Sequence, residues 1–117
     1  MSMPVPQPTR FRQLSAPRQA LVRLCQSINF GRIEHLEIRR YEPVLDPSPQ
    51  VFLDVRLDTE DVPRPELELT DFTLPEEICR LVMHLNAICD GKIDRIEVRA
   101  GIARRLILGV DSLEAAR

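Results

Sequence analysis

The chain has 117 residues, of which 44% are hydrophobic and 29% are charged, and its formal net charge at pH 7 is −2. This length supports one domain with its own hydrophobic core, and the composition is that of a globular protein rather than a disordered or collagen-like one. No apolar run approaches the roughly 20 residues that cross a bilayer, and residues 1–14 lack the apolar stretch of a secretory signal, so we expect neither a membrane protein nor a secreted one.

The N-terminal part of the chain predicts a tail, a helix and a strand. Residues 1–14 contain three prolines and no periodic apolar pattern, which is typical of a disordered or extended tail. Ser15 is a suitable N-cap, and apolar residues at spacings of three and four predict a helix over 16–28. The apolar period changes after Gly31, which indicates a strand over 31–39.

The middle of the chain is acidic and interrupted by prolines. A turn is expected at 40–42, although no glycine is present there. Apolar and polar residues then alternate over 51–57, which is the clearest strand pattern in the sequence. Residues 59–72 predict a surface connector, with a short edge strand at 67–69.

The C-terminal part predicts a second helix and a hairpin. Thr73 and Glu76 have the spacing of a capping box, and Gly91 suits the end of the helix that follows. The remaining elements are expected as strands over 91–99 and 102–108, joined by a tight turn at 100–101, and a C-terminal tail over 110–117.

The most informative feature is an internal repeat, because residues 31–39 recur sixty positions later as residues 91–99. Eight of the nine aligned pairs keep their chemical class, and the ninth places Arg95 where the first copy has His35. Self-similarity at a fixed spacing indicates a duplicated unit. We therefore predict an α+β fold: a two-layer sandwich of two αββ repeats related by a pseudo-twofold axis, with an antiparallel sheet and both helices on one face.

The predicted domain spans residues 15–109. It comprises repeat one (15–58), the acidic connector (59–72) and repeat two (73–109). The expected core residues are Leu21, Leu24, Ile28, Leu36, Ile38, Val51, Leu53 and Val55 from the first repeat, and Leu81, Val82, Leu85, Ile96, Val98 and Leu106 from the second.

Each half also resembles a known family. Residues 28–34 (Ile-Asn-Phe-Gly-Arg-Ile-Glu), followed by alternating apolar residues and a turn, are similar to the YezD-like family of small bacterial proteins, and residues 89–94 share this pattern. The chain differs from that family in having two copies and no glycine turn near Tyr41. The resemblance implies a bacterial origin and a helix, strand and hairpin in each half. The family has no assigned activity, so it implies no functional residue.

No pattern in the sequence indicates catalysis or cofactor binding. The two histidines, His35 and His84, are expected on a charged strand face and beside the apolar stripe of the second helix, and neither is accompanied by a nucleophile. The three cysteines have neither disulfide nor C-x-x-C metal-site spacing, which favours a reduced, cytoplasmic protein. The four glycines are scattered singly and form no phosphate-binding loop. We expect a protein that is not an enzyme and that binds no cofactor or metal.

The charges are segregated along the chain. Residues 1–40 carry a net charge of +5, residues 41–77 of −9 and residues 78–117 of +2. Arginines on the outer face of the sheet could follow a phosphate backbone, so nucleic-acid binding is one alternative. The acidic residues between them favour cross-strand ion pairs instead.

The leading interpretation is therefore a non-enzymatic binding or assembly module of a bacterial cytoplasm, acting as a homo-oligomer or with a protein partner through the exposed edges of its sheet. The candidate interaction face comprises His35, Glu37, Arg39, Arg95, Glu97 and Arg99.

Overall fold

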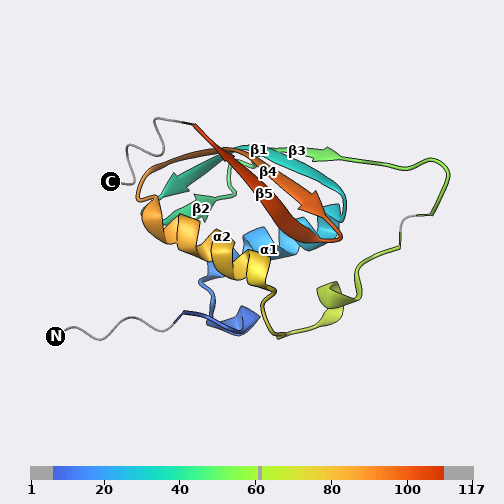
Figure 1. The fold of residues 1–117 in the computed structure, drawn as a ribbon, viewed down its shortest axis with the longest axis horizontal. Helices are drawn as coiled ribbons and strands as arrows, with labels where there is room; N and C mark the ends of the chain where they lie inside the picture. Colours follow the sequence, from blue (N-terminus) through green and yellow to red (C-terminus); the bar gives the residue numbers. More distant parts are fainter. Residues whose placement is uncertain (1–6, 61, 110–117) are drawn as a thin grey trace.

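The computed structural model describes residues 7–60 and 62–109, and the C-terminal tail predicted at 110–117 lies outside them. The elements in chain order are η1 (Phe11–Gln13), α1 (Ala16–Ile28), β1 (Gly31–Arg39), β2 (Glu42–Val44), β3 (Gln50–Leu53), η2 (Pro65–Glu68), α2 (Glu76–Ala87), β4 (Gly91–Arg99) and β5 (Ile102–Leu108), where η denotes a 3-10 helix. The strands form one antiparallel sheet, and both helices cover the same face of it (Figure 1). The predicted α+β class and two-layer arrangement are confirmed.

The two long strands β1 and β4 lie side by side at the centre of the sheet. Their antiparallel register places Gly31 opposite Val98 and Ile38 opposite Gly91. The sheet order is β2-β1-β4-β5, and β3 pairs with β1 on the same side as β2. The chain therefore leaves the sheet after β2 and returns to it as β3, because the prolines between them cannot donate the backbone hydrogen bonds of a continuous strand.

Two tight turns close the hairpins, as the sequence predicts. Arg40 and Tyr41 both have positive φ angles, of 52° and 68°, in the turn between β1 and β2. Ala100 and Gly101 have φ angles of 53° and 75° in the turn between β4 and β5. Positive φ at both central residues defines the turn whose twist matches that of the flanking strands.

A local irregularity at His35 accompanies a change in which side chains of β1 face the helices. His35 has a φ of 58°, whereas the residues around it are extended. Ile33 and Leu36 are both fully buried although they are three residues apart, a spacing that strict alternation along a strand does not allow. The register with β4 is unchanged across this point, since Glu34 lies opposite Arg95 and Leu36 opposite Ile93. The neighbouring strand has the same spacing of three, because Ile93 and Ile96 are also fully buried.

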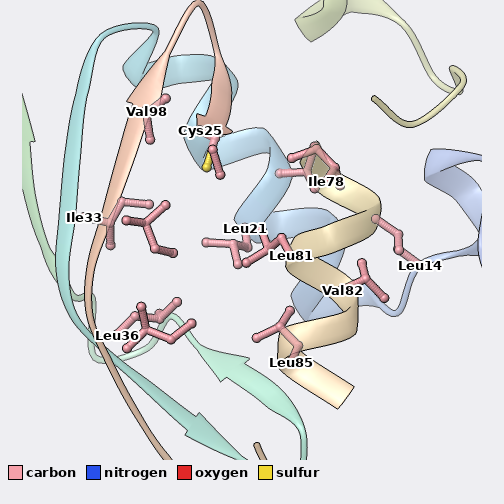
Figure 2. Packing of buried hydrophobic residues seen from close by; sticks show 14 of the residues in the cluster. Leu14, Leu21, Cys25, Ile33, Leu36, Ile78, Leu81, Val82, Leu85 and Val98 are labelled. Atoms are coloured by element: carbon pink, nitrogen blue, oxygen red, sulfur yellow. The ribbon is translucent and has the colours of Figure 1, made fainter. Parts of the chain in front are cut away.

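The core lies between the sheet and the two helices (Figure 2). Nine of the predicted core residues are buried in it: Leu21, Ile28, Leu36, Ile38, Leu81, Val82, Leu85, Ile96 and Val98. Leu24 and Leu106 pack against it while partly exposed.

Three predicted core residues were assigned wrongly. Val51, Leu53 and Val55 are exposed by 36%, 61% and 54%. The strand predicted over 51–57 is also shorter than expected, since only Gln50–Leu53 pairs with β1. The physical reason is that β1 begins at Gly31, opposite Leu53, so no strand lies beside the residues that follow.

Part of the predicted tail belongs to the domain. Phe11 and Leu14 are 4% and 6% exposed and join the core. The backbone of this segment pairs with the chain before α2, because the Phe11 N–H donates to the Phe72 carbonyl (2.9 Å) and the Leu74 N–H donates to the Thr9 carbonyl (2.8 Å). The tail prediction for residues 1–14 is therefore wrong from Thr9 onward within the part that the structure describes.

The N-terminal caps of the two helices differ. The Ser15 hydroxyl accepts from the Arg18 N–H (3.4 Å), as expected for the N-cap of α1. The capping box predicted at Thr73 is absent, since Pro75 is the N-cap of α2 and provides no side-chain hydrogen bond. The Thr73 hydroxyl instead accepts from Arg10 (3.0 Å). The edge strand predicted at 67–69 is also wrong, because η2 occupies this segment.

Candidate interaction surfaces

The six residues of the predicted interaction face lie on β1 and β4 but do not form one cluster. His35, Glu37 and Arg39 are exposed on β1, and the antiparallel register places Glu37 opposite Lys92 and Arg95 opposite Glu34. Because the two strands run in opposite directions, Arg39 and Arg99 stand at opposite ends of the pair. The two copies of the repeat therefore contribute a row of charges along the outer face rather than one site.

Glu34 is the centre of the charged row. Its carboxylate lies 2.5 Å from the Arg32 guanidinium and 3.6 Å from that of Arg95. The hydrogen bond from Arg32, with the additional positive charge of Arg95, lowers the pKa of Glu34 below its ordinary value. Sequence reasoning omitted Glu34 from the candidate face, although its position two residues after Arg32 was a usable signal.

Arg39 and two other charged residues of this face, Glu37 and Glu97, are also in ion pairs. Arg39 lies 2.6 Å from Glu37 within β1, and Arg105 of β5 lies 3.7 Å from Glu97 of β4. Such exposed pairs contribute about 0–1 kcal/mol each. Their main consequence is that neighbouring charges of opposite sign leave no continuous positive track across these strands.

The histidines and cysteines do not assemble a reactive site. His84 lines a pocket of about 270 Å³ between α2 and β5, beside the ion pair of Arg104 and Glu77. Cys25 is fully buried in α1, and its burial raises the pKa of the thiol to about 12, so the reactive thiolate is suppressed. Within the described residues, no group of three or more His, Cys, Asp or Glu side chains could hold a metal ion.

A series of exposed apolar side chains lies on β3 and on the chain that follows it, a segment that we call the β3 arm (residues 50–58). Every residue of the arm is exposed. Leu53 and Val55 are exposed by more than half, and Leu57 is 96% exposed. Figure 1 shows this chain running away from the sheet before it returns to η2. Large apolar side chains rarely gather on a surface unless another molecule covers them.

A groove lies beside the arm. It has a volume of about 350 Å³ and is lined on one side by Leu53 and Val55 and on others by Phe30, Val62 and Leu67. Phe30 and Val62 are themselves 42% and 70% exposed. The apolar side chains of the arm therefore lie beside those of the groove at the edge of the sheet, among the polar lining residues Gln26, Ser27, Asn29, Asp54 and Arg64.

Contacts between the backbones of β1 and β3 hold the base of the arm. The Asp54 N–H donates to the Phe30 carbonyl (2.8 Å), and the Arg32 guanidinium lies over the Phe52 ring at 4.2 Å from its centroid. Sequence reasoning predicted the alternation of the arm but assigned its apolar side to the core. The pattern alone does not distinguish an apolar row that packs within the chain from one that awaits another molecule.

Comparison with family models, with curated proteins and with solved structures found no match. The resemblance to the YezD-like family therefore stays a prediction. None of the helices in the described ranges has the length and apolar character needed to cross a bilayer.

Proposed function

We propose that this protein is a non-enzymatic assembly module of a bacterial cytoplasm and that the β3 arm is its binding surface for another polypeptide. The observation that carries the proposal is the exposed apolar row of the arm, with Leu57 96% exposed. A row of this kind on an edge strand offers a partner both apolar side chains and unpaired backbone groups.

The groove beside the arm supports the same proposal. Strand addition places alternate side chains of the incoming chain into pockets beside the edge, and the groove lined by Leu53 and Val55 lies on the apolar side of the arm. An extended polypeptide with apolar residues at alternate positions fits this surface.

Photo-crosslinking in cells tests the proposal. A photoreactive residue at position 57 should give a covalent adduct with a protein chain, whose mass identifies the chain. The matched control is the same residue at position 83, since Met83 is 58% exposed but lies on α2, away from the arm. An adduct from position 57 that is absent from position 83 is the expected result. Equal adducts from both positions, or none from either, would overturn the proposal.

Nucleic-acid binding is the other function that the sequence suggests, through the Arg-bearing outer face. We do not propose it, because Arg32 and Arg95 both lie within 4 Å of Glu34 and Arg105 lies 3.7 Å from Glu97. A fluorescence-anisotropy titration with mixed oligonucleotides at low salt would reveal any such binding, since electrostatic binding is strongest there.

We further propose that the fold consists of two αββ units related by a pseudo-twofold axis. The same spacing of sixty residues relates the strand pairs. Residue 31 in the first copy corresponds to residue 91 in the second, and residue 38 to residue 98, so the pair Gly31–Val98 corresponds to the pair Gly91–Ile38, which the sheet also contains. In this description β2 and β3 together correspond to β5, with the proline-containing loop inserted between them. The two positive-φ hairpin turns occupy matching places.

A further inference from the structure

The backbone of the β3 arm offers hydrogen-bonding groups at the free edge of the sheet. The Asp54 N–H donates to the carbonyl of Phe30, the residue before β1, and residues two apart along a strand direct their backbone groups to the same side. The groups of Phe52 and Asp54 therefore point towards β1, whereas those of Leu53 point outwards. Beyond Leu53 the chain is not a strand, since residues 54–56 have no regular structure and residues 57–58 lie in a turn. A second strand could thus bond to Leu53 directly, and to Val55 and Leu57 once the arm becomes extended on pairing.

The sequence of the arm is complementary to itself in the antiparallel direction. Residues 53–57 read Leu-Asp-Val-Arg-Leu, so apolar and charged positions are symmetric about Val55. Two arms paired about Val55 would place Leu53 opposite Leu57 of the other copy and Asp54 opposite Arg56 of the other copy. In this pairing the odd-numbered residues of the two arms form the hydrogen-bonded pairs. These are the residues whose backbone groups would point away from β1 in an extended arm.

Neighbouring registers of the strand pair are less favourable, because they oppose like charges or mismatch the apolar rows. Pairing about Asp54 places two carboxylates opposite each other, and pairing about Arg56 places two guanidinium groups opposite each other, which destabilises a strand pair. Registers shifted by one residue oppose the apolar row of one copy to the charged row of the other. In the single chain, Arg56 lies 3.6 Å from Asp58. Pairing would exchange this exposed ion pair for one between Arg56 and Asp54 of the other copy.

We infer that the partner of the β3 arm is a second copy of this chain, bound through antiparallel pairing of residues 53–57 about Val55. This inference rests on the proposed function and names its partner. The interface is two-fold and self-complementary, as in most homodimers. Leu57 of each copy lies beside Leu53 of the other, at the groove that Leu53 lines. Five paired residues bury less than the roughly 800 Å² per partner of a stable complex, so we expect a weak dimer that forms at high protein concentration.

Charge exchange across the strand pair tests the inference, with sedimentation measured over a concentration series. The wild-type chain should shift from monomer to dimer as its concentration rises. In a dimer of Asp54→Arg, arginine would face arginine at both places where residue 54 lies opposite residue 56. In a dimer of Arg56→Asp, aspartate would face aspartate at the same two places. Each variant alone should therefore stay monomeric over the same concentration range. An equimolar mixture of the two restores both opposite-charge pairs and should dimerise again. All these positions are exposed, and unchanged circular dichroism spectra would verify that the fold is kept.

The control is Arg99→Asp, which makes the same charge change at an exposed position on β4 and should leave dimerisation intact. Three outcomes would overturn the inference: a wild-type chain that is monomeric throughout, a mixture that stays monomeric, or loss of the dimer in Arg99→Asp. The proposed function is judged separately. An adduct from position 57 with a different protein, together with a monomeric wild-type chain, would keep the assembly role and remove only the second copy as partner.

Discussion

The carbonyl oxygen of Phe52 lies 2.1 Å from the point that a Cβ atom on Gly31 would occupy. Real Cβ atoms do not approach a backbone oxygen so closely, so β3 can lie against the start of β1 only because residue 31 is a glycine. The sequence marks this position as a repeated glycine. The structure gives the reason in the first copy, which is the close approach of the strand that carries the arm.

Replacing Gly31 with alanine should therefore detach β3. We expect Gly31→Ala to lower the free energy of unfolding by about 1–3 kcal/mol, because the backbones must move apart or remain strained. Urea denaturation measures the loss, and hydrogen exchange should show faster exchange at residues 50–54 than elsewhere. Gly91→Ala is the matched control, since the φ angle of Gly91 is not positive and the residue pairs regularly with Ile38. Equal losses in the two variants would contradict the assignment of this contact.

The N-terminal segment should contribute to stability as a core element. Phe11 stacks on Phe72 with ring centroids 4.8 Å apart, and the Arg23 guanidinium lies 4.3 Å from the Phe11 centroid. Removing a buried phenylalanine side chain costs about 3–5 kcal/mol, and we expect a loss of this size for Phe11→Ala in equilibrium denaturation. The exposed neighbour provides the comparison: Arg12→Ala should change stability by no more than about 0.5 kcal/mol. If Phe11→Ala left the free energy of unfolding unchanged, the segment would not be a core element and the original interpretation as a tail would stand.

The attachment of this segment should also depend on pH. The backbone N–H of Arg12 (3.0 Å) and the guanidinium of Arg10 (3.1 Å) hold the pKa of Asp71 below its ordinary value of 3.8. A carboxyl group whose folded-state pKa is lowered stabilises the fold above the unfolded pKa. That stabilisation is lost as the pH falls through 3.8 towards the lower folded-state value.

Asp71→Asn should accordingly be less stable than the wild-type chain at neutral pH, and the difference should shrink on acidification through this range. Thermal unfolding measured at a series of pH values between neutrality and acid tests the prediction. Glu34, whose pKa is also lowered, is present in both proteins, so its contribution cancels from the difference in stability. Asp46→Asn, at an exposed loop position, is the matched control over the same pH series. A difference that stays constant with pH would contradict the role assigned to Asp71.

The sequence predicted the regular elements well where local rules determine them. The helix cap at Ser15, the turn at Ala100 and Gly101, and the long strands that begin at Gly31 and Gly91 follow from residue type and spacing alone. The arm could not be placed in this way. Its alternation is as clear as that of β1, but whether the apolar side is buried depends on which strand lies beside it, and β1 begins only at Gly31, opposite Leu53.

The N-terminal core residues illustrate a second limit. Phe11 and Leu14 form no periodic pattern, and Phe11 is held by contact with Phe72, which is about sixty residues away in the sequence. Ile33 shows a third limit. Counting alternate residues outwards from Leu36 puts Ile33 on the solvent face, whereas the irregular backbone at His35 accompanies its burial. The spacing of three between two apolar residues was nevertheless a readable signal of that irregularity.

The position at which the two repeats differ in kind, His35 against Arg95, is also a position at which their backbones differ. His35 has a positive φ, which histidine tolerates better than most residues do, whereas Arg95 does not have one. A left-handed conformation costs a residue other than glycine about 1–2 kcal/mol. His35→Gly removes this cost and adds a smaller loss of backbone entropy, so its stability should lie within about 1 kcal/mol of the wild-type value.

His35→Val should instead lower the free energy of unfolding by about 1–2 kcal/mol, because a β-branched side chain is strained at positive φ. The control is Arg95→Val, at the aligned position, where φ is not positive. It should cost no more than about 1 kcal/mol for the exposed pair with Glu34. Equilibrium denaturation of the three variants decides the point. If valine were tolerated equally at 35 and 95, the positive φ of His35 would not explain why the copies differ, and a ligand at His35 would have to be sought instead.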